Sequence, residues 1–182
     1  MNMKKLKNTK LKFYWSFAIL FALLSFISIS CSSDDDDDKV VGGNGNSYMK
    51  VTINGKEENL TDVRARWMDN SNYLEVSGRT KDNQSIMITV ISDTKVPIGS
   101  YSLDSSQQFK LISIYSDNRN NAQKNYTASY ETIWPDSFNL AIEIINSSKV
   151  EGKFAGILVI GNGDEVEAKA TLTNGSFSAP FK

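Results

Sequence analysis

The stretch Phe138-Asn139-Leu140-Ala141-Ile142-Glu143-Ile144 decides the fold of this chain. A large apolar side chain occupies every second position, and Asn, Ala and Glu lie between them. Because a β-strand points successive side chains to opposite faces, this period of two predicts a strand with one buried face and one wet face. Antiparallel sheets permit such a division between core and solvent.

The same period of two recurs along the chain, at residues 49–53, 63–67, 86–90 and 166–172. Turn-forming residues separate these runs, at 54–55, 69–72, 81–83, 161–164 and 174–175. Asn and Gly supply the positive φ angles that tight β-turns need. The pattern predicts an all-β domain, an antiparallel β-sandwich of about ten strands. An up-and-down or partly open β-barrel remains the alternative.

The composition shifts twice before this domain and predicts three parts: 1–30, 31–47 and a single β domain at 48–182. The last part carries 14 Lys and Arg against 16 Asp and Glu. Nucleic-acid binding relies on clustered basic residues, so this balance argues against a nucleic-acid partner. A domain of this length buries enough surface to fold without a disulfide or a metal.

Residues 1–30 have the order of a bacterial secretory signal: five lysines, an apolar segment at 13–29, and small Ser30 before Cys31. The sequence Ile-Ser-Ile-Ser-Cys at 27–31 resembles the lipobox of bacterial lipoproteins, although Ser28 and Ser30 replace its usual residues. The resemblance implies that Cys31 is diacylated and becomes the new N-terminus, so that lipid holds the protein to a membrane. A retained membrane helix is the alternative.

An acidic run follows Cys31 almost at once. Five adjacent like charges repel one another and normally mark a solvated tether, which continues through the Gly- and Asn-rich residues 40–47. The run also resembles the export signal of surface lipoproteins of Bacteroidota, which implies display on the outer face of the outer membrane. The residues of this predicted signal are Ser33, Asp34, Asp35, Asp36, Asp37 and Asp38.

A second resemblance is carried by motifs spread over the domain: Val-Thr-Ile-Asn-Gly-Lys at 51–56, Ile-Gly-Ser-Tyr at 98–101, Gly-Lys-Phe-Ala-Gly at 152–156 and Thr-Asn-Gly-Ser-Phe at 173–177. In this order they look like a family of small lipoproteins of Bacteroidota with no established activity. The resemblance therefore implies no catalytic residues.

The residue inventory argues against catalysis. The chain has no histidine and its one cysteine is Cys31, which excludes the usual Ser-His and Cys-His systems and typical zinc sites. We therefore expect no catalytic residues, no metal and no cofactor. A hydrolase that uses two carboxylates remains conceivable, although no pair of acids is singled out.

Three aromatic residues are the candidates for ligand binding: Trp134, Tyr126 and Tyr130. Trp134 lies beside Pro135 in a connection, where an exposed ring could stack on a sugar or a partner side chain, or instead fold back over the core. Tyr126 and Tyr130 share a strand face and could equally be packed or paired across strands.

Taken together, the sequence predicts a non-enzymatic, surface-exposed lipoprotein whose β domain binds a glycan or a protein. An accessory subunit of an outer-membrane complex is the second possibility, and the carboxylate-dependent hydrolase is the third. A large exposed apolar patch would favour the accessory subunit, and a concave aromatic groove would favour the glycan binder.

Overall fold

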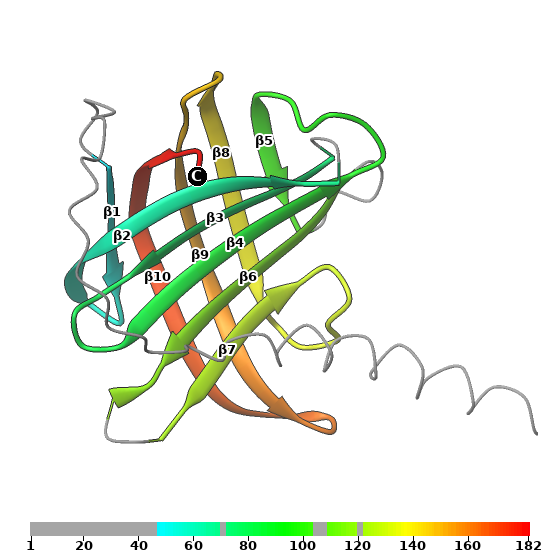
Figure 1. The fold of residues 1–182 in the computed structure, drawn as a ribbon. Helices are drawn as coiled ribbons and strands as arrows, with labels where there is room; N and C mark the ends of the chain where they lie inside the picture. The colour runs from blue at the N-terminus through cyan, green and yellow to red at the C-terminus, as the bar shows by residue number, and fades with distance from the viewer. Residues whose placement is uncertain (1–46, 70–71, 104–108, 120–121) are drawn as a thin grey trace, which may run out of the picture. The chain divides into compact units, whose positions relative to one another are not determined.

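The computed structural model describes residues 47–69, 72–103, 109–119 and 122–182 (Figure 1). These residues form one antiparallel sheet of ten strands, which confirms the all-β prediction. The strands are β1 (Tyr48–Ile53), β2 (Lys56–Met68), β3 (Tyr73–Arg79), β4 (Gln84–Ser92), β5 (Gly99–Ser102), β6 (Phe109–Asp117), β7 (Lys124–Ser129), β8 (Ser137–Ile145), β9 (Lys149–Asn162) and β10 (Glu165–Pro180).

The sheet is curled into two layers that cross each other. In Figure 1, β2, β3, β4, β6 and β7 run diagonally across the view and form the front layer. Behind them, β10, β9, β8 and β5 run more steeply and form the back layer. At one side the layers are joined through β1, which pairs with both β2 and β10.

At the other side the layers meet at a single pairing, Thr127 of β7 with Val159 of β9. The strand order in the sheet departs from the order along the chain at β5, which pairs with β8 in the back layer, so that β4 pairs directly with β6. It departs again at β8, which lies beyond β9 instead of between β7 and β9. Two facing layers of one continuous sheet fit both the sandwich and the partly open form that the sequence left open.

Local turn chemistry explains most of the hairpins. Asn54 and Gly55 adopt φ values of 50° and 84° between β1 and β2, as expected for a tight hairpin turn. The Asn54 side chain also accepts a hydrogen bond from the backbone N–H of Thr171, which ties the hairpin to β10. The prediction of a turn at Asn174-Gly175 is wrong: both residues lie within β10, where the pairing with β9 shifts at a β-bulge.

The core lies between the two layers. The front layer contributes inward-facing Leu74, Val76, Ile86, Ile88, Val90, Leu111 and Tyr115, and the back layer contributes Phe138, Leu140, Ile142, Phe154, Leu158, Leu172 and Phe177. All of these side chains are buried.

Three phenylalanines of the back layer each pack against a glycine of a neighbouring strand. A Cβ atom added at Gly156 would lie 2.6 Å from the Phe138 ring, and one added at Gly175 would lie 2.6 Å from the Phe154 ring. A Cβ atom at Gly152 would lie 2.9 Å from the ring of Phe177. We call these three pairs the Phe–Gly contacts; they let large rings lie directly on the backbone of the next strand.

Candidate functional site

Trp134 lies in the connection between β7 and β8, which Asp136 organises. The carboxylate of Asp136 accepts hydrogen bonds from the backbone N–H of Ser129 at 2.8 Å and from the hydroxyl of Thr132 at 2.5 Å. The indole ring folds back over Gly161 of β9, and its N–H donates to the carbonyl of Gly163 at 3.3 Å. The ring is half-buried, whereas the neighbouring Ile133 is 78% exposed.

The two candidate tyrosines, Tyr126 and Tyr130, lie in different surroundings. Tyr126 stacks on Tyr115 with ring centroids 5.5 Å apart and packs against the core. Tyr130 donates a hydrogen bond from its hydroxyl to Glu131 at 2.7 Å, while the ammonium group of Lys110 lies 5.3 Å from its ring centroid. Burial raises the pKa of Tyr130. Within the described residues no ring contact joins Trp134 to either tyrosine.

The outer side of the front layer carries an apolar surface. By strand register, outward-facing Met87 of β4 lies opposite Ile114 of β6, and Ile91 of β4 lies opposite Tyr73 of β3. Ile112 lies opposite Thr89. We call the outer side chains of Met68, Tyr73, Met87, Ile91, Ile112 and Ile114 the apolar face. All six are at least partly exposed, and Met68 is 36% exposed.

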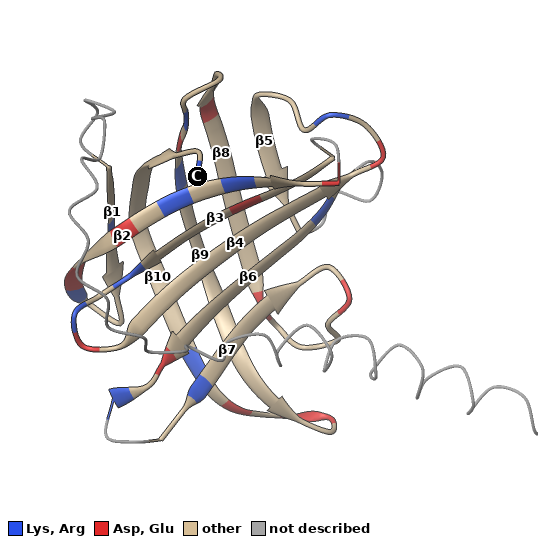
Figure 2. Ribbon diagram, viewed as in Figure 1, with Lys and Arg blue, Asp and Glu red and all other residues tan. Residues whose placement is uncertain are grey.

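One ion pair, between Arg66 and Glu75, lies within the apolar face, because Glu75 pairs with Thr89 between Tyr73 and Ser77 of the same strand. The other charged groups lie around the face. Figure 2 shows β4 without a charged residue along its whole length, and charges on β6 only near its ends. Among the outward positions of β3, β4, β6 and β2 from Arg64 onward, the one acid is Glu75, which is 6% exposed and bonded to Arg66 at 2.9 Å. That hydrogen bond raises the pKa of Arg66. Arg64 and Arg79 are exposed and have no ion pair in the described part of the chain.

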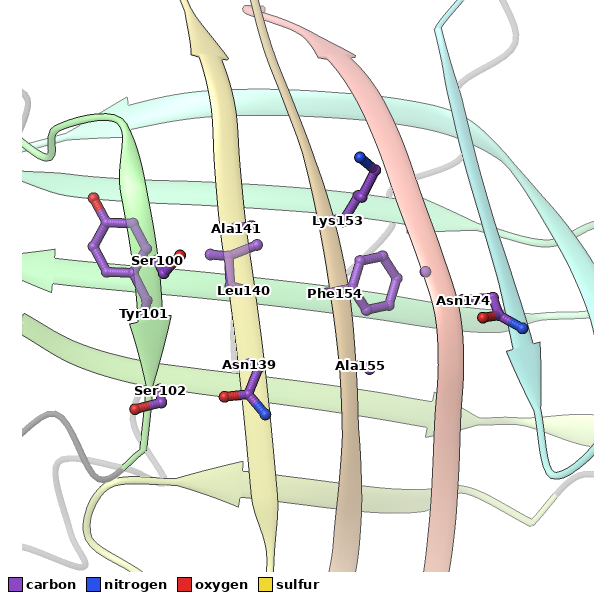
Figure 3. Close-up of a pocket in the computed structure, with 11 residues that line it drawn as sticks. Ser100, Tyr101, Ser102, Asn139, Leu140, Ala141, Lys153, Phe154, Ala155 and Asn174 are labelled. Carbon is purple, nitrogen blue, oxygen red and sulfur yellow. The ribbon is translucent and has the colours of Figure 1, made fainter.

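A shallow depression lies on the outer side of the back layer (Figure 3). It has a volume of about 580 Å³ and crosses β5, β8, β9 and β10. The side chains that border it from the solvent side are Ser100, Ser102, Asn139, Ala141, Lys153, Ala155 and Asn174. The aromatic residues of its lining, Tyr101 and Phe154, are buried, so that no aromatic ring is presented to a ligand there.

Several acids of the domain form ion pairs with basic residues on the surface. Glu143 bonds to Lys153 at 2.6 Å, and Glu151 bonds to Lys149 at 2.6 Å. The hydrogen bond from Lys149 lowers the pKa of Glu151. Where the structure describes the chain, it contains no group of three acid, cysteine or histidine side chains able to hold a metal ion.

Sequence reasoning missed both the apolar face and the depression. The apolar face had a signal: residues 86–91 are Ile-Met-Ile-Thr-Val-Ile, a nearly continuous apolar run, which is typical of a strand covered on both sides. The depression had none, because it depends on the register between β8, β9 and β10 and on the pairing of β5, which is distant in the sequence, with β8.

Cys31, Ser33 and the aspartates at 34–38 lie outside the described residues, so their predicted roles stay predictions. In the part of the chain that is described, no helix has the length and apolar character of a membrane span. No protein-family model, curated protein or solved structure matches the chain.

Proposed function

We propose that this protein is a non-catalytic, lipid-anchored surface protein whose β domain docks a protein partner through the apolar face. The observation that carries the proposal is the outer surface of β3, β4 and β6, where large apolar side chains occupy positions that solvent-facing strands normally give to polar ones. Contiguous exposed apolar surface typically marks an interaction site. Such a surface favours the possibility that the protein is an accessory subunit of an outer-membrane complex.

The charged residues around the apolar face indicate the kind of partner that would bind there. Arg64, Arg79 and Lys110 are exposed on the same side of the sheet, while Glu75 is already paired with Arg66. A complementary surface therefore has an apolar centre surrounded by acidic groups. Two copies of this chain meeting through the apolar face would bring basic rims together, which opposes self-association.

The anchor follows from the order of the N-terminal residues. Acylation of Cys31 would attach the domain to the outer membrane, and the acidic run would direct it to the cell exterior. A lipid anchor confines the domain to the plane of the membrane, which raises its effective concentration toward a membrane-embedded partner.

The docking proposal is tested by placing a charge at the centre of the apolar face. Ile112→Glu should leave the fold intact, because the side chain points outward, but should reduce co-purification of a cross-linked partner from intact membranes at least tenfold, on the order expected for a hot spot. Thr171→Glu is the matched control, because Thr171 is an exposed strand residue of the back layer. Equal loss or equal retention in both variants would refute the proposal.

The anchoring proposal is tested by cell fractionation. Cys31→Ala should release the protein from the membrane fraction, and continued retention would indicate an uncleaved helix instead. Replacing the five aspartates at 34–38 with serine should remove accessibility to protease on intact cells. Unchanged accessibility would exclude the surface-export role of this run.

A further inference from the structure

We propose that the depression on the back layer binds a neutral, polyhydroxylated ligand, such as one end of a saccharide. This site lies on the opposite layer from the apolar face, and the proposal does not depend on protein docking. It rests on the arrangement of two asparagine amides around an alanine, on the absence of net charge and on the size of the hollow.

The centre of the site is Ala155 of β9, which has an asparagine on each side. Asn139 of β8 is its direct partner across the sheet. On the other side, Gly175 pairs with Phe154 and Leu172 pairs with Gly156, so that Thr173 and Asn174 together lie opposite Ala155. This is one of two register shifts in the pairing of β10 with β9, and such β-bulges commonly redirect a side chain at a binding surface. Figure 3 shows Asn139, Ala155 and Asn174 on adjacent strands.

The two amides are available to a ligand. Both asparagines are exposed, and neither side chain has a hydrogen-bond partner among the described residues. Each primary amide offers a carbonyl acceptor and two N–H donors in one plane. Adjacent hydroxyl groups of a sugar supply the complementary donor and acceptor, and the Ala155 methyl between the amides suits the C–H face of a sugar ring.

The charge of the site does not favour an anionic ligand. Lys153 is the one charged residue in the lining, and its ammonium group already bonds to Glu143 at 2.6 Å. This hydrogen bond raises the pKa of Lys153. The volume of about 580 Å³ falls within the range of small-molecule sites. Without an exposed aromatic ring to stack on, binding should be weak, with a Kd of about 1 mM.

The experiment is an amide chemical-shift titration of the full-length protein in detergent micelles. The probes are maltotriose, mannotriose and the N-acetylglucosamine trimer, with inorganic sulfate as the anion probe. We expect at least one trisaccharide to shift the amides of Asn139, Ala155 and Asn174. Ala155→Leu should fill the depression and weaken that binding about tenfold, and Thr171→Leu is the matched control on the same layer.

Asn174→Gly provides a second variant that preserves the fold. Asn174 has a φ of 53°, which glycine adopts without strain, so this change removes the amide and keeps the bulge. It should weaken saccharide binding about fivefold, as expected for a lost neutral hydrogen bond. The proposal is overturned if no trisaccharide shifts these amides, if Ala155→Leu binds as tightly as Thr171→Leu, or if only sulfate binds.

Discussion

The front and back layers of the sheet bury the same core but differ in the side chains that they present to solvent. The central front strands, β4 and β6, contain no glycine and carry apolar side chains on both faces. On the inside of the back layer, rings pack against glycines of neighbouring strands; on the outside, small polar side chains and alanines surround the depression, and charged residues lie beside it. Under the docking proposal, a partner would cover the outer side of the front layer, whereas the outer side of the back layer would stay in contact with water.

The largest expected effect comes from the interior of the back layer. Phe154 contacts both Phe138 and Phe177, with ring centroids 6.0 Å and 6.3 Å away. Phe154→Ala should lower the free energy of unfolding by about 4 kcal/mol, because it leaves a cavity at the centre of the core. Urea denaturation measures this. Ile112→Ala on the apolar face is the control and should cost less than about 1 kcal/mol.

The next effect tests the Phe–Gly contacts themselves. A Cβ atom at position 156 would lie 2.3 Å from the carbonyl oxygen of Ser137, so Gly156→Ala should lower the free energy of unfolding by about 3 kcal/mol. Ser77→Ala on β3 is the control and should change it by less than about 0.5 kcal/mol. Similar values for the two variants would show that the glycines do not shape the back layer.

A smaller and opposite effect is expected in the front layer. The hydroxyl of Ser113 is fully buried on the core side of β6 and has no hydrogen-bond partner among the described residues. Ser113→Ala removes this unpaired polar group and should raise the free energy of unfolding by about 1 kcal/mol. Thermal or urea unfolding will show the sign, and a loss of stability would mean that the hydroxyl is satisfied in solution.

The smallest expected effect is the contribution of two buried tyrosines to stability, which is measured at alkaline pH. Burial raises the pKa of Tyr115 in the front layer and that of Tyr101 in the back layer, each to about 12. An unfolded tyrosine has a pKa of about 10, so the folded state retains these protons more strongly. Their contribution to stability is therefore complete below about pH 10 and is lost as the pH rises to about 12.

Single Tyr→Phe variants show how much of this loss of stability at high pH comes from each layer. The hydroxyl of Tyr115 donates to the side-chain oxygen of Gln84 at 3.0 Å, and that of Tyr101 donates to the carbonyl of Pro97. Each of the variants Tyr115→Phe and Tyr101→Phe should show a shallower fall in unfolding free energy above pH 10 than the parent protein. A pH profile identical to the parent in both variants would contradict the assignment.

The strands and first hairpin could be predicted because they depend on local chemistry. The alternation at Phe138–Ile144 and the Asn54-Gly55 pair specify a strand and a turn almost independently of their surroundings. Asn174-Gly175 carries the same turn signal, yet it lies within a long strand, because pairing with β9 on one side and β1 on the other overrides it. The positive φ of Asn174 serves a bulge instead.

The candidate sites could not be predicted to the same extent, because they depend on which strands become neighbours. Alternation within β4 identifies Ile86 and Ile88 as core residues, but it gives no reason to expect Met87 and Ile91 to lie beside Ile112 and Ile114. Ala155 acquires its two asparagine neighbours only through the pairings of β9 with β8 and β10. The sequence predicts Trp134 in a connection, but its contact with Gly161 depends on how β9 lies beside that connection.

The Phe–Gly contacts bear on how relatives of this chain should be recognised. The motifs at 152–156 and 173–177 supply five of the six residues in these contacts, all except Phe138, so they reflect how the back layer packs and give no information about a ligand. A protein that shares them inherits the shape of the back layer. Its binding preference would have to be read from the outward positions between them, where substitution leaves the interior untouched.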